Sequence, residues 1–248
     1  MAVERISYGP DPNQFGELRL PVLNGPHAAA IVIHGGFWRA AYGLDHISLL
    51  AGALPDLGIA AWNIEYRRLG HPGGGWPGTL EDVANAARFL REIAPGRHID
   101  PDRVIAIGHS AGGHLALWLA ASRRIALRGV VSLAGVADLR RAFDLRLGRD
   151  VVREFLGATP GEAPERYRDA SPIERVPLGV RQRLIHGERD DIVPIEIARR
   201  HVDAARKQGD DARLVALEDA GHFEVIDPGS SVWPRIEAAI RELTGSPG

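Results

Sequence analysis

The chain has 248 residues, of which 45% are hydrophobic and 25% charged, as is ordinary for a globular protein with a large core. Its formal net charge is −2, so neither nucleic acid nor an anionic membrane is expected as a partner. The absence of cysteine excludes disulfides, thiolate metal sites and a cysteine nucleophile, and it favours a cytoplasmic location. The polar stretch 1–16 lacks the apolar segment of a signal peptide, and no apolar run has the length of a membrane helix.

The first part of the chain alternates short strands with a helix and loops. Residues 17–20 alternate polar and apolar side chains and predict an edge strand. The continuous apolar run 28–33 predicts a central strand, and 59–64 predicts the next one. Between them, 44–54 is helical in pattern and ends before Pro55 and Gly58. Residues 70–78 contain five glycines and two prolines and are expected to form a loop.

The middle of the chain continues this alternation. Thr79 is expected to cap a helix that ends at Pro95. A strand over 103–107, a helix over 111–121 and a strand over 129–133 follow. Residues 138–176 break the rhythm, because their charges and prolines indicate only short helices and loops.

The last part restores the alternation, with strands expected at 184–186 and 214–217 and helices at 195–207 and 231–243. Strands that alternate with helices predict an α/β fold, with a mostly parallel sheet covered by helices on both faces. The segment 138–176 is too short and too rich in proline and charge to form a core of its own. We therefore expect one domain over 1–248 that carries this segment as an insertion.

The sequence G-x-S-x-G at 108–112 places Ser110 between a buried strand and a buried helix. A turn this tight requires glycine at 108 and 112, because a side chain there would crowd the neighbouring backbone. The serine would stand at a helix N-terminus, where backbone N–H groups and the helix dipole favour negative charge. This context predicts a nucleophilic serine.

A serine hydroxyl needs a base to take its proton, and the base needs an acid that orients it. Asp190 or Asp191 follows the strand at 184–186, and His222 follows the strand at 214–217. Each position lies just past the carboxyl end of a predicted strand, where open α/β sheets place their sites. From the residues alone, Asp190 could instead be a turn or capping residue, and His222 an ordinary loop histidine.

An oxyanion hole requires N–H donors aimed at the developing negative charge. The N–H of Ala111 is one expected donor. The segment His34-Gly35-Gly36-Phe37-Trp38 follows a strand and supplies the others, which we assign to Gly36 and Phe37. The alternative is a plain glycine turn with a packed Trp38.

The segments HGGFW, GHSAGGHLA, HGERDDIVP and GHF together resemble the α/β-hydrolase superfamily over roughly residues 6–240. Within it they look most like the kynurenine formamidase-like esterases. The resemblance implies an α/β-hydrolase fold and a triad of Ser110, Asp190 and His222, because the acid of the family pattern HG-x-x-D falls on Asp190. It also implies a hydrolase of small carboxylic esters or amides, with N-formylkynurenine as an alternative substrate.

No cofactor is expected, and His109 and His114 have no carboxylate partner at a spacing typical of metal ligands. His109 is interpreted as a packing residue and His114 as a helix residue near the site. Trp38, Trp76 and Phe223 are assigned to substrate binding as walls of a small acyl pocket, unless these aromatic rings point into the core. The expected partner is a small-molecule ester or amide, and the sequence does not indicate an oligomeric state. A non-catalytic ligand-binding protein on the same scaffold is the distant alternative.

Overall fold

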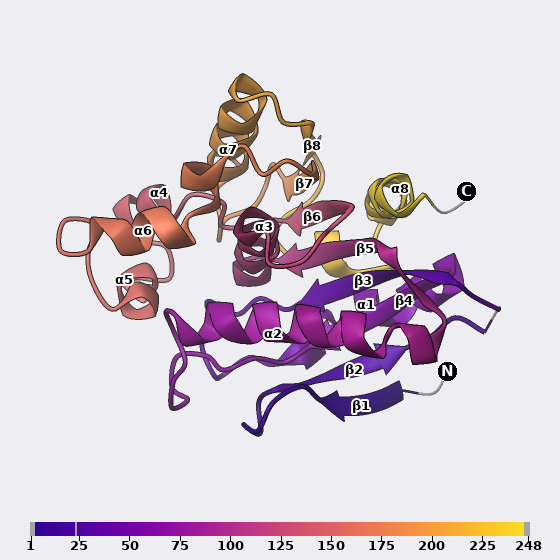
Figure 1. The fold of residues 1–248 in the computed structure, drawn as a ribbon. Coiled ribbons are helices and arrows are strands. Elements are labelled where there is room, and N and C mark those ends of the chain that lie inside the picture. Colours follow the sequence, from indigo (N-terminus) through magenta and orange to yellow (C-terminus); the bar gives the residue numbers. More distant parts are fainter. Residues whose placement is uncertain (1–2, 23, 246–248) are drawn as a thin grey trace.

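The computed structural model describes residues 3–22 and 24–245. Within them eight strands form one sheet in the order β1-β2-β4-β3-β5-β6-β7-β8 (Figure 1). The strands are β1 (Val3–Ser7), β2 (Phe15–Arg19), β3 (His27–Ile33), β4 (Ile59–Ile64), β5 (Ile99–His109), β6 (Gly129–Leu133), β7 (Arg181–Gly187) and β8 (Ala212–Leu217). Strand β2 pairs antiparallel with β1 and β4, and all other pairs are parallel, so the prediction of a mostly parallel sheet is confirmed.

Helices cover both faces of this sheet because its strands are apolar on both sides. In β3, Ile31 belongs to one buried cluster and the next residue, Val32, to the other, as the two-residue period of a strand requires. The helices are α1 (Ser48–Ala53), α2 (Gly78–Ile93), α3 (Ala111–Ser122), α4 (Leu139–Asp144), α5 (Val151–Leu156), α6 (Pro164–Ala170), α7 (Glu196–Lys207) and α8 (Trp233–Thr244). Apolar residues of α1 and α8 share the cluster of Val32, and those of α2, α3 and α7 share the cluster of Ile31.

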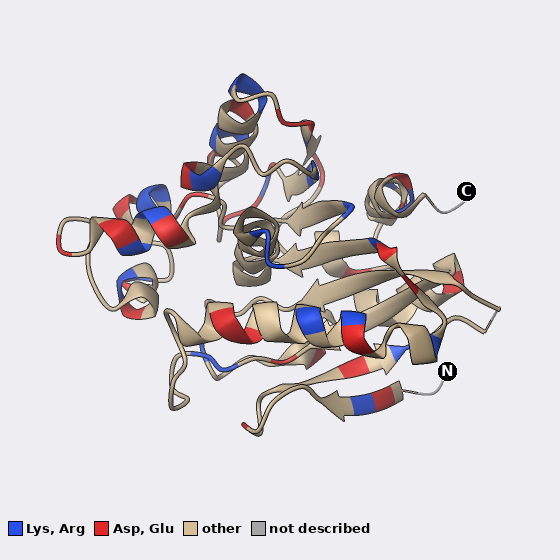
Figure 2. Cartoon of the chain, in the orientation of Figure 1, with Lys and Arg blue, Asp and Glu red and all other residues tan. Residues whose placement is uncertain are grey.

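The segment 138–176 forms α4, α5 and α6, which lie together at one end of the sheet (Figure 1). Phe155 and Tyr167 from this segment are fully buried in the same cluster as the central strands. The segment therefore extends the main core. Its charges of both signs are interspersed over its helices (Figure 2).

Two local predictions were wrong. The strand expected at 17–20 is an inner strand, β2, because β1 pairs with its free side. Because the residues of β1 are largely exposed, its sequence has no apolar face that would have revealed the strand. Thr79 does not cap α2: it lies within the first turn, where its hydroxyl donates to the carbonyl of Arg67 at 2.5 Å.

Among the described residues, no helix combines the length and the apolar character needed to span a membrane.

Candidate active site

Ser110 joins β5 to α3 in a strained turn, with φ 55° and ψ −119°. A Cβ on Gly108 would collide with the carbonyl of Gly112, and a Cβ on Gly112 would collide with the carbonyl of Ile33. The two glycines are therefore required by backbone-to-backbone contact, as the sequence analysis expected. A hydrogen bond from the Ser110 N–H to the carbonyl of Leu133, 2.8 Å long, fixes the turn against β6.

His222 follows β8 and Asp190 follows β7, and the structure brings their side chains together. His222 Nδ1 lies 2.7 Å from Asp190 Oδ2. The backbone N–H groups of Ile192 and Val193 donate to the other carboxylate oxygen at 2.9 and 2.8 Å. His186 Nε2 lies 3.2 Å from Asp190 Oδ2.

These contacts decide the charge state of the acid and the tautomer of the histidine. Burial raises the pKa of Asp190, but hydrogen bonds from His186 and His222, the charge of His222 and the backbone donors lower it by more. The carboxyl is therefore ionised at neutral pH and can only accept hydrogen bonds. The proton of a neutral His222 then sits on Nδ1, and Nε2 is free to act as a base.

Asp191, the other acid weighed from the sequence, is exposed.

Ser110 and His222 both line a cleft of about 140 Å³. It is lined by Gly36, Phe37, Tyr42, His46, Ser110, Ile192, His222 and Phe223. The structure records no hydrogen bond between Ser110 Oγ and His222 Nε2, both of which belong to described residues. Such bonds commonly tighten only when a substrate is bound.

The segment after β3 turns back onto the serine. Gly36, Phe37 and Trp38 have φ values of 103°, 53° and 55°, and a hydrogen bond of 2.9 Å from the N–H of Arg39 to the carbonyl of Gly36 closes this run into a tight turn. A Cβ on Gly35 would lie 2.8 Å from the carbonyl of His109 and 3.0 Å from Cβ of Ser110, so this turn touches the serine turn directly.

The N–H groups of the three residues assigned to the oxyanion hole have no acceptor among the described residues. The N–H groups of Gly36 and Phe37 donate to no other described residue. Ala111 begins α3, so its N–H has no acceptor within the helix. Unpaired N–H groups of this kind are the donors that an oxyanion hole needs.

Two buried side chains that the sequence analysis did not assign support this turn. His34 Nδ1 lies 2.7 Å from the carbonyl of Gly35, and His34 Nε2 lies 2.9 Å from Glu65 Oε1. Glu65 also accepts from the N–H of Leu44 at 3.1 Å. The pair thus connects the end of β3, the end of β4 and the residues that precede α1. The segment HGGFW drew attention to His34, which is its first residue. Nothing in the sequence around Glu65 indicated that this residue is the partner of His34.

The three aromatic residues assigned to substrate binding lie in different places. Phe223 is 53% exposed and lines the cleft. Trp38 is only 1% exposed: its ring stacks on Phe155 and its Nε1 donates to His114. The assignment of Trp38 as a wall of the substrate pocket is corrected, because its ring packs in the core.

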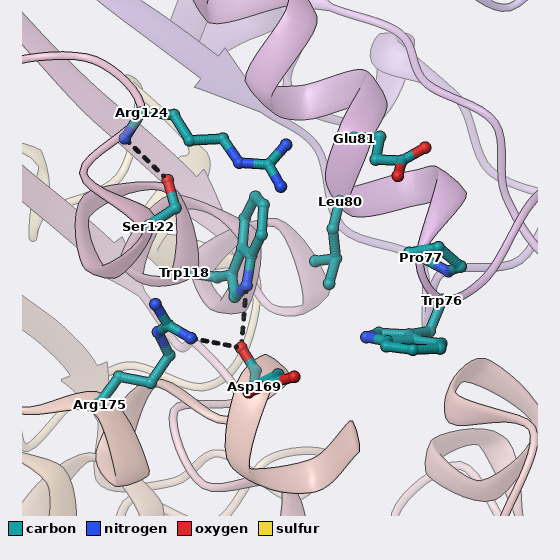
Figure 3. Close-up of a pocket in the computed structure, with 9 residues that line it drawn as sticks. All are labelled: Trp76, Pro77, Leu80, Glu81, Trp118, Ser122, Arg124, Asp169 and Arg175. Atoms are coloured by element: carbon teal, nitrogen blue, oxygen red, sulfur yellow. Dashed lines mark hydrogen bonds between the residues drawn. The ribbon is translucent and has the colours of Figure 1, made fainter. Parts of the chain in front are cut away.

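Trp76 also lies outside the cleft. It lines a separate pocket of about 350 Å³ together with Trp118 and Leu80 (Figure 3). The guanidinium carbon of Arg166 lies over the Trp76 ring, 4.8 Å from its centroid. The assignment of Trp76 to the same wall is likewise corrected, because the loop before α2 carries it toward α3 and α6.

Within residues 3–22 and 24–245, no group of three or more His, Asp or Glu side chains is arranged to hold a metal ion.

Comparisons with known proteins agree with this architecture. The model of the BD-FAE family matches residues 20–203, which is most of the chain. Esterase LipC of Mycobacterium tuberculosis is 30% identical over an alignment that covers 94% of this chain and 62% of LipC. Probable carboxylic ester hydrolase LipM of the same organism is 28% identical, over 75% of this chain and 46% of LipM. The chain thus spans less than two thirds of the length of either relative.

Solved structures show the same fold. A truncated carbohydrate esterase from gut microbiota superimposes with a TM-score of 0.83 at 21% identity, over 97% of this chain and 95% of that chain. Thermogutta terrifontis esterase 2, in a form phosphoramylated by tabun, superimposes with a TM-score of 0.79 at 22% identity, over 97% and 92%. The fold is that of the α/β-hydrolases, as the sequence motifs implied.

Proposed function

The chain belongs to the BD-FAE family, and we propose that it is a serine hydrolase that cleaves small carboxylic esters through an acyl-enzyme. The observation that carries this proposal is the contact between Asp190 and His222 at 2.7 Å. It engages Nδ1 of His222 and leaves Nε2 out of the contact, on a histidine that lines the same cleft as Ser110. The relatives named esterase LipC and probable carboxylic ester hydrolase LipM support the same chemistry.

In the proposed mechanism, Ser110 Oγ attacks the ester carbonyl carbon while its proton passes to His222 Nε2. Asp190 holds the resulting imidazolium in place through Nδ1. The tetrahedral oxyanion accepts hydrogen bonds from the N–H groups of Gly36, Phe37 and Ala111. Each such donor typically contributes about 3–4 kcal/mol to the transition state.

The intermediate then collapses. The C–O bond to the alcohol breaks, and the alcohol leaves with the proton from His222. Water attacks the acyl-enzyme, again giving up a proton to His222 Nε2, and that proton returns to Ser110 Oγ as the carboxylic acid is released. The cycle restores the starting protonation states.

The cleft volume of about 140 Å³ supports a small acyl group. Phe37, Tyr42 and Phe223 contribute aromatic rings to its wall, and of the three residues assigned to substrate binding from the sequence only Phe223 lines it. Because one extra methylene in a filled pocket costs about 1–3 kcal/mol of transition-state binding, acetyl and propionyl esters should react at least about tenfold faster than octanoyl esters in kcat/KM. No cofactor is part of the proposal.

A formamide substrate remains the second candidate, on the resemblance of HGGFW and GHSAGGHLA to the kynurenine formamidase-like esterases. A formyl group is the smallest acyl group, and the same mechanism would cleave it from an arylamine. We also propose that the described residues form one domain and that the protein acts in the cytoplasm, for which the lack of cysteine is the support.

One set of assays tests the proposal. A fluorophosphonate probe should label the protein at Ser110, and a protein that only binds a ligand should stay unlabelled. Initial rates with p-nitrophenyl esters from acetate to decanoate should fall as the acyl chain lengthens. A rate that rises with chain length would contradict the small acyl pocket, and a higher kcat/KM for N-formylkynurenine than for p-nitrophenyl acetate would favour the formamidase.

A further inference from the structure

Two histidines outside the proposed triad form a chain of hydrogen bonds that ends on His222. His109 ends β5 next to Ser110 and is completely buried. His46, in the short helix Leu44–Ile47, lines the cleft. His46 Nε2 lies 2.8 Å from His109 Nδ1, and His109 Nε2 lies 2.8 Å from the main-chain oxygen of His222.

The acceptor at the end of this chain determines the tautomers. A main-chain oxygen only accepts, so His109 Nε2 carries a proton. Burial, and then the charges of His222 and His46, hold the pKa of His109 well below its usual value, so the ring is neutral and Nδ1 is bare. His46 must then donate from Nε2. Burial, and then the charges of His34 and His222, lower the pKa of His46 to about 4, so it is neutral as well.

The pair supplies one of two restraints on His222. Asp190 binds the side chain and sets the direction of the ring. His109 binds the main chain of His222 and links the loop after β8 to the serine turn. This second restraint matters because Ser110 itself makes no hydrogen bond to His222 in the structure. The centroid of the Phe223 ring lies 6.0 Å from that of His109 and 6.1 Å from that of His46, so this ring packs against both histidines.

We infer that His109, supported by His46, is a positioning residue that holds His222 at working distance from Ser110. The inference rests on the proposed function, because it assigns the base to His222. Since His109 is the neighbour of Ser110 in the chain, its hydrogen bond transmits the position of the serine turn directly to the loop of the base. A misplacement of about 1 Å in such a geometry can lower a rate by about 10²-fold.

Amide side chains separate the two hydrogen bonds of His109. The amide nitrogen of glutamine reaches the place of Nε2, and that of asparagine reaches only the place of Nδ1. His109→Gln should therefore keep the bond to His222 and hold kcat for p-nitrophenyl acetate within about threefold of the native value. His109→Asn should lose that bond and lower kcat by about 10- to 100-fold, with KM changed by less than about twofold.

His114 provides the matched control. It is as completely buried as His109 and follows Ser110 in the chain, in α3. Its Nε2 lies 2.9 Å from the carbonyl of Ala170, and its Nδ1 accepts a hydrogen bond from Trp38. Neither contact involves His222. His114→Asn should lower Tm about as much as His109→Asn but leave kcat of the folded protein unchanged. Equal kcat in His109→Gln and His109→Asn, or an equal loss of kcat in His114→Asn, would overturn the inference.

A spectroscopic readout keeps this test apart from that of the proposed function. Long-range 1H–15N spectra should show His109 and His46 as neutral Nε2–H tautomers at pH 7 in native and Ser110→Ala protein alike. The groups that face the pair are His222, Asp190, His34 and Tyr42. A protonated Nδ1 on His109 would overturn the inference whatever the activity. Undiminished hydrolysis in Ser110→Ala would instead overturn the proposed function.

Discussion

Asp82, in α2, and Asp190, in the loop after β7, both carry carboxylates that are fully buried. Asp82 accepts three hydrogen bonds from Arg67, at 2.7–2.9 Å, and a fourth from Gln14 at 2.7 Å. Asp190 accepts from two backbone N–H groups and from His222. Both carboxylates are thus fully hydrogen-bonded, as burial requires.

The difference lies in the partner. A guanidinium keeps its charge at all ordinary pH values, so the Asp82–Arg67 pair cannot change state and serves to hold the start of α2 to the segment after β4. An imidazole can gain and lose a proton near neutral pH, and His222 lines a cleft. The same buried carboxylate is therefore structural beside Arg67, and beside His222 it is suited to proton transfer. Four experiments test this contrast.

The largest effect is expected from the proposed nucleophile and base. Ser110→Ala and His222→Ala should each lower kcat by about 10³- to 10⁶-fold, and the double variant should be little worse than either, because the residues act as a unit. Steady-state rates with p-nitrophenyl acetate measure this. Additive losses in the double variant would show that the two side chains do not act in one step.

Asp190→Asn should lower kcat by about 10³-fold or more, because an amide can hold His222 in the wrong tautomer. The fold should survive. Asp191→Asn, at the exposed neighbour, is the matched control and should keep most of the activity. An inactive Asp191→Asn beside an active Asp190→Asn would reverse the assignment of the acid.

Asp82→Asn should have the opposite signature. It leaves the buried side of Arg67 without a countercharge, and breaking a buried ion pair costs about 3–5 kcal/mol of the free energy of unfolding. Urea denaturation measures this loss. kcat of the protein that remains folded should stay close to native, and a large loss of kcat would place Asp82 in the catalytic group after all.

The smallest effect is expected for the pH dependence of stability, at the buried histidine His201. Its hydrogen-bond partner is the neutral side chain of Gln182 and not a carboxylate. Burial lowers the pKa of His201 from 6.5 to about 4. Between these values the unfolded chain binds more protons than the folded one, so stability should fall as the pH drops from 6.5 toward 4. His201→Gln keeps a donor toward Gln182, which the histidine contacts at 2.7 Å, and should reduce the fall in Tm between pH 7 and pH 5. An unchanged fall would mean that His201 is already protonated in the folded protein.

Much of the fold was predictable because the strands that build the centre are continuous apolar runs. Residues 129–133 and 59–64 matched β6 and β4 at both ends, since a strand buried on both faces has a sharp apolar boundary. Strand β1 was not predicted, because an exposed edge strand has no apolar face to detect. The sequence motifs also located Ser110, Asp190 and His222 at one edge of the sheet, where the structure brings them together.

The misplaced and missing residues have a common cause. Trp38 lies next to cleft residues in the sequence, and Trp76 lies in a loop expected near the site. The direction of each ring depends on a partner that is distant in the sequence, Phe155 for Trp38 and Arg166 for Trp76. The contact between His46 and His109 joins residues 63 positions apart. Contacts of this kind follow from tertiary packing, which no local spacing encodes.

The glycine contacts around Ser110 have a consequence for how the protein can change. The turn after β3 and the serine turn meet through backbone atoms, and a Cβ at Gly35 would already lie 2.8 Å from the carbonyl of His109. By contrast, Phe37, Tyr42, Ile192 and Phe223 line the cleft with side chains that take no part in this backbone contact. Laboratory evolution of this chain should therefore accumulate substitutions at those four positions, with altered acyl selectivity, while Gly35, Gly108 and Gly112 stay unchanged.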